Sequence, residues 1–251
     1  MSIRIGLCGA SGKMGQALVQ RISESNKNCS ITAKFTSAST INDLKEFCKN
    51  SDVIIDFSSP DILKPLLDNS VLYNTKLVIG TTNIKQIHVD FLNEASNYIP
   101  IIYSANMSIC ANLMTIFSAK IAKILASNDY DIEILDKHHS LKKDSPSGTS
   151  LMIGRAIASA RNVMFEESAI FNRHDKGGRL KNEIGFSSIR GGGIYGEHDV
   201  FFIGDNETLT IKHQAFNKIS FADGAIEATC WIIDKQSGLY SMIDVLDYAQ
   251  I

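Results

Sequence analysis

Hydrophobic residues in the first hundred positions fall into short runs, and each run ends at a glycine, proline or polar residue that breaks the pattern. Such runs are typical of strands buried in a parallel sheet. They predict strands over Ile3–Cys8, Ile31–Phe35, Asp52–Phe57, Lys76–Gly80 and Pro100–Tyr103. Between them, apolar residues at helical spacing predict helices over Met14–Ser25, Leu44–Cys48, Pro60–Asn69 and Ile84–Asn97. Strands that alternate with helices indicate βαβ units in a parallel sheet that helices cover on both faces.

The pattern changes after Asn106. Helices are predicted over Leu113–Leu125 and Thr149–Ala160, with a strand over Asp131–Asp136 between them. From Ile184 to His213 several strands follow one another with glycine turns and no helix, which is typical of antiparallel sheet. A last helix is predicted over Phe221–Lys235, and we expect it to pack on the first part of the chain.

A glycine-rich segment joins the first predicted strand to the first predicted helix. Its glycines, Gly9, Gly12 and Gly15, form GxxGxxG, a variant of the GxGxxG fingerprint. Small residues let the backbone approach a pyrophosphate, and the start of a helix offers N–H groups and partial positive charge. The alternative is a tight turn with a purely structural role. The position in a first βαβ unit favours a cofactor loop, so we predict an α/β fold: a Rossmann-like dinucleotide-binding domain (1–108 and 218–251) with an inserted α+β domain (109–217) that contains a mostly antiparallel open sheet.

The end of the second strand bears on which nucleotide is used. Folds that prefer NAD usually place a carboxylate there for the ribose hydroxyls, whereas this chain has Thr36 and Ser37. With help from Lys13, these hydroxyls are suited to a 2′-phosphate. We expect NADPH or NADH as cofactor, with a preference for NADPH.

Composition narrows the class of protein. The formal net charge is −2, which disfavours nucleic acid or an anionic membrane surface as the main partner. The 5 cysteines are scattered and form no CxxC pair, so reduced thiols are the simplest interpretation. No apolar run approaches the ~20 residues of a membrane span, and the first residues lack a signal-peptide pattern. We expect a cytoplasmic protein.

A segment in mid-chain carries acid–base chemistry. It contains His138, His139 and Lys142 and leads into Ser147, which we predict to cap a helix and leave the following N–H groups for an anion. Histidine exchanges protons near neutral pH, and lysine offers a point charge to a carboxylate. Paired histidines also suit zinc in principle. However, no third ligand stands at a convincing spacing, and adjacent strand residues point to opposite faces, so we expect no metal.

Several other polar residues are weaker candidates. Arg190 and His198 flank a glycine turn, and two interpretations are open for them: a reach into the active site, and the favoured one, a place in the sheet and its loops. His88 and His213 are expected to be structural or solvated. Asp56 ends a strand, where a contact with the cofactor and closure of the turn are equally good interpretations. The basic stretch that contains Arg173, His174, Lys176 and Arg179 is expected to be solvated.

The segment HHSLKKDSPSGTS, residues 138–150, resembles the signature of the 4-hydroxy-tetrahydrodipicolinate reductase (dihydrodipicolinate reductase) family. Other segments resemble further parts of that family, so that the resemblance covers nearly the whole chain: CGASGKMG at 8–15, VIGTTN at 78–83, SANMS at 104–108, GEHDV at 196–200 and FADGA at 221–225. Departures from the family pattern are Thr36-Ser37 at the end of the second strand, Lys218 where many members have arginine, and Met107 where an aromatic residue is common.

The resemblance implies hydride transfer from NADPH or NADH to a cyclic dicarboxylate with loss of water, which gives tetrahydrodipicolinate in the diaminopimelate and lysine pathway. His138 would be the proton donor and acceptor, and Lys142 the second catalytic residue. The residues implied to bind the substrate carboxylates are His139, Ser147, Gly148 and Thr149. Those implied or expected to contact the cofactor are Gly9, Ala10, Ser11, Gly12, Lys13, Met14, Thr36, Ser37, Gly80, Thr81, Thr82, Ser104, Ala105, Asn106 and Met107.

The family is typically a homotetramer assembled through the sheet of the inserted domain, so we expect the same assembly here. Two other functions stay open. One is a different imine or aldehyde oxidoreductase with the same two-domain plan, which the HHxxK and SPSGT segments disfavour. The other is a protein that binds NAD(P) without turnover, which would not need a proton donor together with a carboxylate-binding segment.

Overall fold

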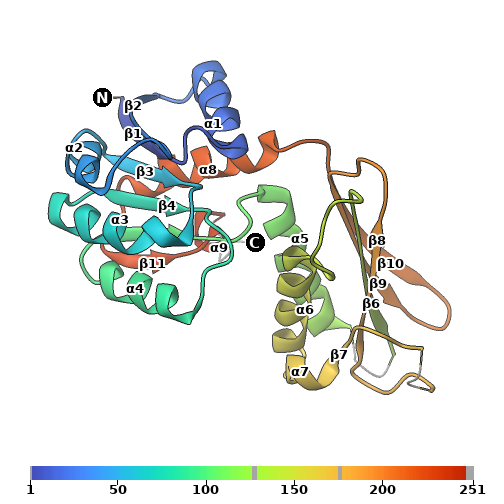
Figure 1. The fold of residues 1–251 in the computed structure, drawn as a ribbon. Coiled ribbons are helices and arrows are strands. Elements are labelled where there is room, and N and C mark those ends of the chain that lie inside the picture. Colours follow the sequence, from blue (N-terminus) through green and yellow to red (C-terminus); the bar gives the residue numbers. More distant parts are fainter. Residues whose placement is uncertain (1, 126–128, 175–176, 247–251) are drawn as a thin grey trace. The chain divides into compact units, whose positions relative to one another are not determined.

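The computed structural model describes residues 2–125, 129–174 and 177–246 (Figure 1). The chain divides into two compact units. Unit 1 consists of Met1–Ile109 and Lys218–Ile251, and unit 2 of Cys110–Asn217. The fold class predicted from the sequence is confirmed, because unit 1 contains a parallel sheet with helices and unit 2 a second sheet.

Unit 1 is built on a six-stranded sheet in the order β11-β5-β4-β3-β1-β2, and every pairing between its strands is parallel. The strands predicted in the first hundred residues are all present, within two residues at either end. The sequence did not predict β11, which has 3 residues and is too short to show a pattern. The strands are β1 (Ile3–Cys8), β2 (Cys29–Phe35), β3 (Val53–Asp56), β4 (Lys76–Ile79), β5 (Pro100–Tyr103) and β11 (Gly238–Tyr240).

Helices cover both faces of this sheet (Figure 1). On one face, α1 and α8 pack on the strands through residues such as Leu18 and Ile226. On the other face, α2, α3 and α4 contribute residues such as Leu44, Leu66 and Leu92. The expected return of the C-terminal helix to the first part of the chain is thus confirmed. The helices of unit 1 are α1 (Lys13–Glu24), the 3-10 helix η1 (Ile41–Asp43), α2 (Leu44–Lys49), α3 (Pro60–Tyr73), α4 (Gln86–Ser96), α8 (Ile219–Ile232) and α9 (Met242–Val245).

Unit 2 contains a five-stranded mixed sheet in the order β10-β9-β6-β8-β7. Strand β9 is antiparallel to β6 and β10, whereas β8 is parallel to β6 and β7. The expectation of antiparallel sheet therefore holds for two of the four pairings. The reason is that a crossover containing α6 separates β6 from β8, and a crossover brings the next strand back parallel. The strands are β6 (Asp131–His138), β7 (Ala169–Ile170), β8 (Ile184–Arg190), β9 (Gly196–Ile203) and β10 (Thr208–Ala215).

The helices of unit 2, which are α5 (Ile109–Ile124), α6 (Gly148–Ala160) and the short α7 (Phe165–Ser168), pack on one face of that sheet (Figure 1). Ile153 of α6 and Met114 of α5 join Ile134 of β6 and Val200 of β9 in one buried cluster. Side chains alternate along a strand, so the neighbours of these residues point to the opposite face of the sheet.

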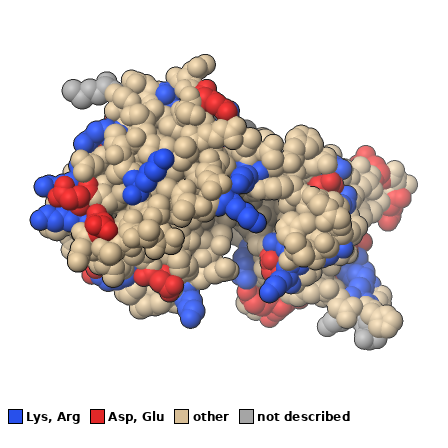
Figure 2. All heavy atoms as spheres, turned by 45° about the horizontal axis from the view of Figure 1, so that its top comes forward, with Lys and Arg blue, Asp and Glu red and all other residues tan. Residues whose placement is uncertain are grey.

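None of the helices in the described ranges is long and apolar enough to cross a membrane. On the face of the molecule drawn in Figure 2, basic and acidic side chains are interspersed. This distribution agrees with the near-neutral formal charge of the chain.

Candidate functional site

The glycine loop of unit 1 is held in a tight turn that needs glycine at two positions. Gly9 has a φ of +80°, and a Cβ there would lie 2.6 Å from the carbonyl oxygen of Phe57. A Cβ on Gly15 would lie 2.3 Å from the carbonyl oxygen of Gly9. The amides of Gly9 and Ala10 both donate to the carbonyl of Phe35, which fixes the loop to the end of β2. The first turn of α1 therefore stands close against the sheet.

The start of α1 is electrostatically suited to an anion. Its N-cap is Gly12, which has no side-chain oxygen to satisfy the first amides of the helix. Lys13 opens the helix and is exposed, and the ammonium of Lys218 donates to the carbonyl of Lys13 at 2.5 Å. Lysines are unfavourable at the positive end of a helix dipole unless an anion lies there too. A phosphate group would satisfy both the amides and the ammonium groups.

The topology places this loop at the switch point of the sheet. Strand β1 has β2 on one side and β3 on the other, so the chain leaves it in opposite directions. Ligands of open α/β sheets bind outside the carboxyl ends of the strands at such a point. The backbone geometry, the glycine cradle and the charge therefore all fit a dinucleotide in unit 1.

Asp56 ties together the ends of three strands at this point. Its carboxylate is fully buried and accepts bonds from the Ser58 amide at 3.0 Å and from the Thr81 hydroxyl at 2.7 Å. It also bonds the thiol of Cys8, at the end of β1. Burial raises the pKa of Asp56, although these hydrogen bonds oppose the shift. Asp56 thus closes the turn, which is one of the two interpretations that the sequence left open.

The other predicted cofactor residues on these loops differ in accessibility. Gly80 lies against Phe57, because a Cβ there would be 2.3 Å from the ring. Thr81 is buried and Thr82 is exposed. At the end of β2, Ser37 is exposed, while the Thr36 hydroxyl accepts a bond from the Ala38 amide.

The segment after β5 forms a compact turn. The hydroxyl of Ser104 donates to the carbonyl of Asn106 at 2.7 Å, and the side chain of Asn106 accepts from the Ser108 amide at 2.9 Å. Ala105 is exposed at the tip. Met107 is 1% exposed and belongs to the core of unit 1, so a cofactor can meet this residue through its backbone alone.

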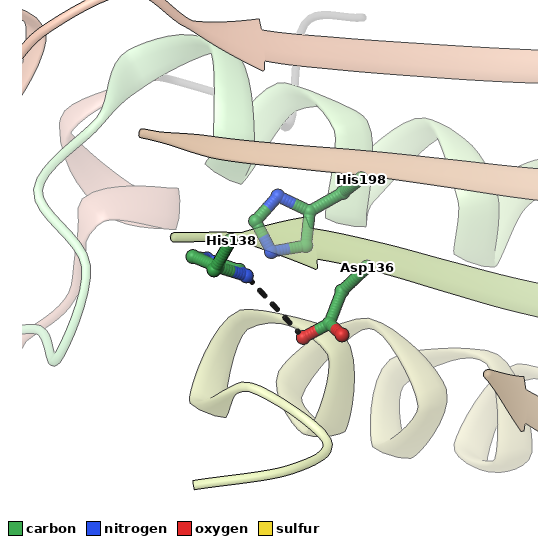
Figure 3. Close-up of side chains that lie close together, drawn as sticks. All are labelled: Asp136, His138 and His198. Atoms are coloured by element: carbon green, nitrogen blue, oxygen red, sulfur yellow. Dashed lines mark ion pairs between the residues drawn. The ribbon is translucent and has the colours of Figure 1, made fainter. Parts of the chain in front are cut away.

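In unit 2 the carboxyl end of β6 brings together an acid and two imidazoles (Figure 3). Asp136 and His138 share the buried face of β6 because they are two residues apart. His198 lies directly opposite Asp136 on β9. The Nδ1 atom of His138 lies 3.6 Å from Oδ2 of Asp136, and the rings of His138 and His198 meet edge to face at 5.3 Å. His213 of β10 stacks on His198 from the other side at 5.9 Å.

Burial dominates the proton affinity of these imidazoles. It lowers the pKa of His138 to about 4, with Lys142 and Arg190 adding to the effect and Asp136 opposing it. It lowers the pKa of His198 to about 3, with further lowering from His138 and His213. Burial acts to raise the pKa of Asp136, but hydrogen bonds from Arg190, Ser188 and Ser147 outweigh it and lower that pKa to about 2. Near pH 7 the cluster holds neutral imidazoles beside an ionised carboxylate.

The start of α6 lies beside this cluster, as expected from the sequence. Ser147 is the N-cap, and its hydroxyl accepts from the Ser150 amide at 3.2 Å. The same hydroxyl lies 3.1 Å from Nε2 of His198. Ser147 is 2% exposed. Gly148 is exposed, and a Cβ there would meet nothing within 4 Å. Thr149 is half-buried at the next position.

The loop between β6 and α6 carries the other predicted substrate residues. Lys142 is 21% exposed and pairs with Asp144 at 2.8 Å. His139 is half-buried, one residue after the end of β6. The unit thus holds an imidazole, an ammonium group and a helix start within one short stretch of chain.

The acid and the two imidazoles are also close enough to share a cation, since one ligand atom from each lies within 4.8 Å of the others. However, both oxygens of Asp136 already accept bonds from Arg190, at 2.9 and 3.3 Å. Because a guanidinium occupies the carboxylate, the arrangement is that of an ion pair beside two histidines.

No motif of the sequence indicates the part that Asp136 plays here, and for Arg190 and His198 the sequence favours a place in the sheet over a reach into the site. The predicted strand ends at Asp136, whereas β6 continues to His138, and only this longer strand puts the two residues on one face by alternation. Arg190 and His198 lie in the sheet as expected, but both reach this cluster. Their pairing with β6 brings them there across more than fifty residues of chain, and the sequence carries no local signal for it.

The remaining weak candidates have structural roles. The amide of Lys85 donates to Nδ1 of His88, which therefore caps the start of α4. Arg173 pairs with Glu183 at 2.7 Å and Arg179 with Asp131 at 2.8 Å, so neither is simply solvated. Lys176 lies outside the described residues.

Comparisons with known proteins agree along the whole chain. Residues 3–107 match the family model described as "Dihydrodipicolinate reductase, N-terminus", and residues 110–246 match "Dihydrodipicolinate reductase, C-terminus". A 4-hydroxy-tetrahydrodipicolinate reductase from Rickettsia bellii is 52% identical over 244 residues, which are 97% of this chain and 94% of the relative. The corresponding protein of Zymomonas mobilis is 38% identical over 248 residues, 98% of this chain and 97% of the relative.

Solved structures show the same fold. The dipicolinate-bound dihydrodipicolinate reductase from Paenisporosarcina sp. TG-14 matches with a TM-score of 0.76 at 22% identity. The match covers 97% of this chain and 99% of the other.

Proposed function

The chain belongs to the dihydrodipicolinate reductase family, and from this premise we propose how its two units divide the reaction between them. The activity is that of an NAD(P)H-dependent oxidoreductase, 4-hydroxy-tetrahydrodipicolinate reductase, in the diaminopimelate and lysine pathway. The substrate gains a hydride and a proton and loses water, which leaves tetrahydrodipicolinate and the oxidised nucleotide. Unit 1 holds the nucleotide, and unit 2 holds the cyclic dicarboxylate.

Backbone groups do most of the binding in unit 1. The bound nicotinamide supplies the hydride. The amides of Ser11 and Lys13 receive the phosphates, and Lys218 adds positive charge beside them. Thr36 and Ser37 face the ribose end of the nucleotide, and the turns at 80–82 and 104–107 line the remainder of the nucleotide site. Support comes from the glycine contacts and from the position of the loop at the switch point of the sheet.

Side chains do the corresponding work in unit 2. His138 is the proton donor, and Lys142 stabilises the negative charge of the substrate and assists the proton transfer. His139 and the amides of Gly148 and Thr149 bind the carboxylates, and the Ser147 cap sets the position of these amides. The observation that carries this assignment is the closeness of His138 to the capped start of α6, because a proton donor and an anion site then share one end of the sheet.

The protonation of His138 couples chemistry to binding. In the free protein its pKa is about 4, so the imidazole is neutral at pH 7. A substrate with two carboxylates brings negative charge to the site, and nearby negative charge favours the imidazolium. His138 therefore takes up a proton as the substrate binds and donates it to the substrate during reduction.

The assembly and location follow the family. The face of the second sheet opposite α5 and α6 carries Leu135, Phe201 and the exposed Ile189 and Ile203, and we assign it to a homotetramer interface. All five cysteines are free, which suits a cytoplasmic enzyme.

One assay tests the activity. Purified protein is mixed with NADPH or NADH and freshly generated product of dihydrodipicolinate synthase, and the absorbance of the reduced nucleotide is followed. We expect consumption of nucleotide that depends on the substrate. A protein that binds both nucleotides but consumes neither would overturn the proposed function.

A further inference from the structure

We propose that Asp136 is a positioning residue for this reaction, and that its single carboxylate fixes both the catalytic imidazole and the substrate-binding end of α6. The inference rests on the proposed function, because it concerns the same proton donor. None of the motifs in the sequence points to Asp136, and it does not touch the substrate in the proposed mechanism. Its role follows from what its two oxygens contact.

The first contact concerns the tautomer of His138. Nδ1 of this ring faces Oδ2 of Asp136 at 3.6 Å (Figure 3), an ion-pair distance, and no hydrogen-bond partner for Nδ1 is found among the described residues. A carboxylate on that side favours a hydrogen on Nδ1. Nε2 is then the atom that takes and gives the proton. A Cβ on Gly196 would lie 3.2 Å from Nε2, so the glycine keeps that side of the ring accessible.

The second contact concerns the anion site. Oδ2 of Asp136 also accepts the amide hydrogen of Ser147 at 2.7 Å. Ser147 caps α6, so this bond sets where the following amides stand relative to β6. One carboxylate oxygen therefore touches both ends of the loop that carries Lys142.

Arg190 holds the carboxylate in place. Its guanidinium donates to Oδ1 of Asp136 at 2.9 Å and, through Nη2, to the carbonyl of Asp144 at 2.8 Å. Asp144 is the ion-pair partner of Lys142. The arginine thus links the fixed carboxylate to the middle of the same loop. Such a bidentate contact has a defined geometry, which a lysine would not reproduce.

The charges around His138 support a specific role for this carboxylate. The imidazole faces Asp136 on its own strand, His198 on β9 with His213 behind it, Arg190 on β8, and Lys142 and Asp144 on the loop. Asp136 is the fully buried acid in this set, whereas Asp144 is exposed. Removal of Asp136 therefore removes the buried negative charge that favours the imidazolium.

The test is a comparison of the full-length wild type with Asp136→Asn. The asparagine keeps the size of the side chain and can still accept the Ser147 amide, but it loses the charge. We expect kcat to fall about 100-fold, within the range that a well-placed general acid contributes. The basic limb of the kcat profile should move to lower pH, because His138 holds its proton less tightly. The KM for the nucleotide should stay unchanged.

Two further proteins separate positioning from general damage. Glu133→Gln removes a carboxylate from the same strand that is also paired with arginines, and it should leave kcat and its pH profile as they are. The double variant Asp136→Asn/Arg190→Gln removes the unpaired positive charge that the single variant leaves. It should restore thermal stability but not kcat.

A spectroscopic measurement makes the inference independent of activity. Nitrogen-15 histidine spectra, with His138 assigned by its loss in His138→Gln, should show the Nδ1–H form in the wild type and a smaller share of that form in Asp136→Asn, because an amide oxygen attracts the hydrogen less strongly than a carboxylate does. If the folded Asp136→Asn keeps wild-type kcat, pH profile and tautomer, Asp136 is not a positioning residue. If the wild type itself fails to turn over, the proposed function fails instead.

Discussion

The two units prepare their binding sites in opposite ways. Unit 1 relies on backbone: glycines that admit close approach, amides at the start of α1, and one buried carboxylate that ties loops together. Unit 2 relies on ionisable side chains crowded at the end of β6, with an ion pair beneath two imidazoles. A backbone site depends on shape and changes little with pH, whereas a side-chain site depends on protonation. Conditions and substitutions should therefore affect the two units separately.

The largest difference between an effect on turnover and an effect on nucleotide binding is expected from His138→Gln. Without the proton donor, kcat should fall about 10²–10⁴-fold, while the dissociation constant for NADPH should stay within twofold of the wild-type value. Stopped-flow turnover and nucleotide titration measure the two quantities on the same preparation. His88→Gln, on a helix of unit 1, is the matched control and should change neither. Loss of nucleotide affinity in His138→Gln would break the division between the units.

Gly15→Ala is expected to act on the other unit and to weaken nucleotide binding. The added methyl would lie 2.3 Å from the carbonyl oxygen of Gly9, so the glycine loop must shift. We expect NADPH affinity to fall about 10- to 100-fold, since a displaced amide site loses several hydrogen bonds of about 1 kcal/mol each. Gly148→Ala, where a Cβ meets nothing within 4 Å, is the control in unit 2 and should leave NADPH affinity unchanged. Equal losses in both variants would contradict this prediction.

Acid should weaken unit 2 before unit 1. The pKa values of His138 and His198 are lowered to about 4 and about 3, below the usual value of 6.5, so the unfolded chain binds protons first. The free energy of unfolding is then intact above pH 6.5 and falls as the pH drops toward 4, by at most about 1.4 kcal/mol per pH unit for each histidine. The raised pKa of Asp56 has the opposite sign and does not weaken unit 1 in acid.

Tryptophan fluorescence and hydrogen exchange can follow the two units separately. Trp231, the single tryptophan, lies in α8 and reports on unit 1. The protection factors of the amides in β6 and β9, which correct for the slower intrinsic exchange in acid, should fall between pH 6.5 and 5 while the fluorescence of Trp231 stays constant. Simultaneous change in both signals would mean that the units do not respond independently.

The smallest effect is expected at Lys218. Its ammonium lies against the carbonyl of Lys13, beside the proposed phosphate site. Lys218→Met should weaken NADPH binding about 3- to 5-fold at low salt, since an exposed charge of this kind contributes roughly 1 kcal/mol or less. The difference should vanish at high salt because screening removes it. Lys49→Met, on α2, should have no effect under either condition.

The two units also differ in how far the sequence predicts them. Gly9, Gly12 and Gly15 are neighbours in the chain, and a strand, a turn and a helix in direct succession produce the loop, so local pattern suffices. The same holds for Ser147, which caps α6 as predicted. The ends of strands are harder to predict where tertiary contacts set them. The sequence predicts that β6 ends at Asp136, although pairing with β8 extends it to His138.

The sequence underestimates the role of residues that act through pairing between distant strands. Arg190 and His198 look like ordinary sheet residues because their partners, Asp136 and Ser147, are far away in sequence. A single sequence contains no register between strands. Only the pairing of β6 with β8 and β9 brings a guanidinium onto the carboxylate and an imidazole onto the cap of α6.

The short loop between β6 and α6 has a consequence for redesign. It is anchored at both ends by Asp136 and in the middle by Arg190, so an insertion or deletion would pull the anchors apart. Its intervening side chains are less constrained, since Leu141 and Lys143 point outward. The loop therefore has a fixed length but tolerates substitution at its outward positions. Libraries that aim at activity on other cyclic acids should randomise those positions and keep the length of the loop.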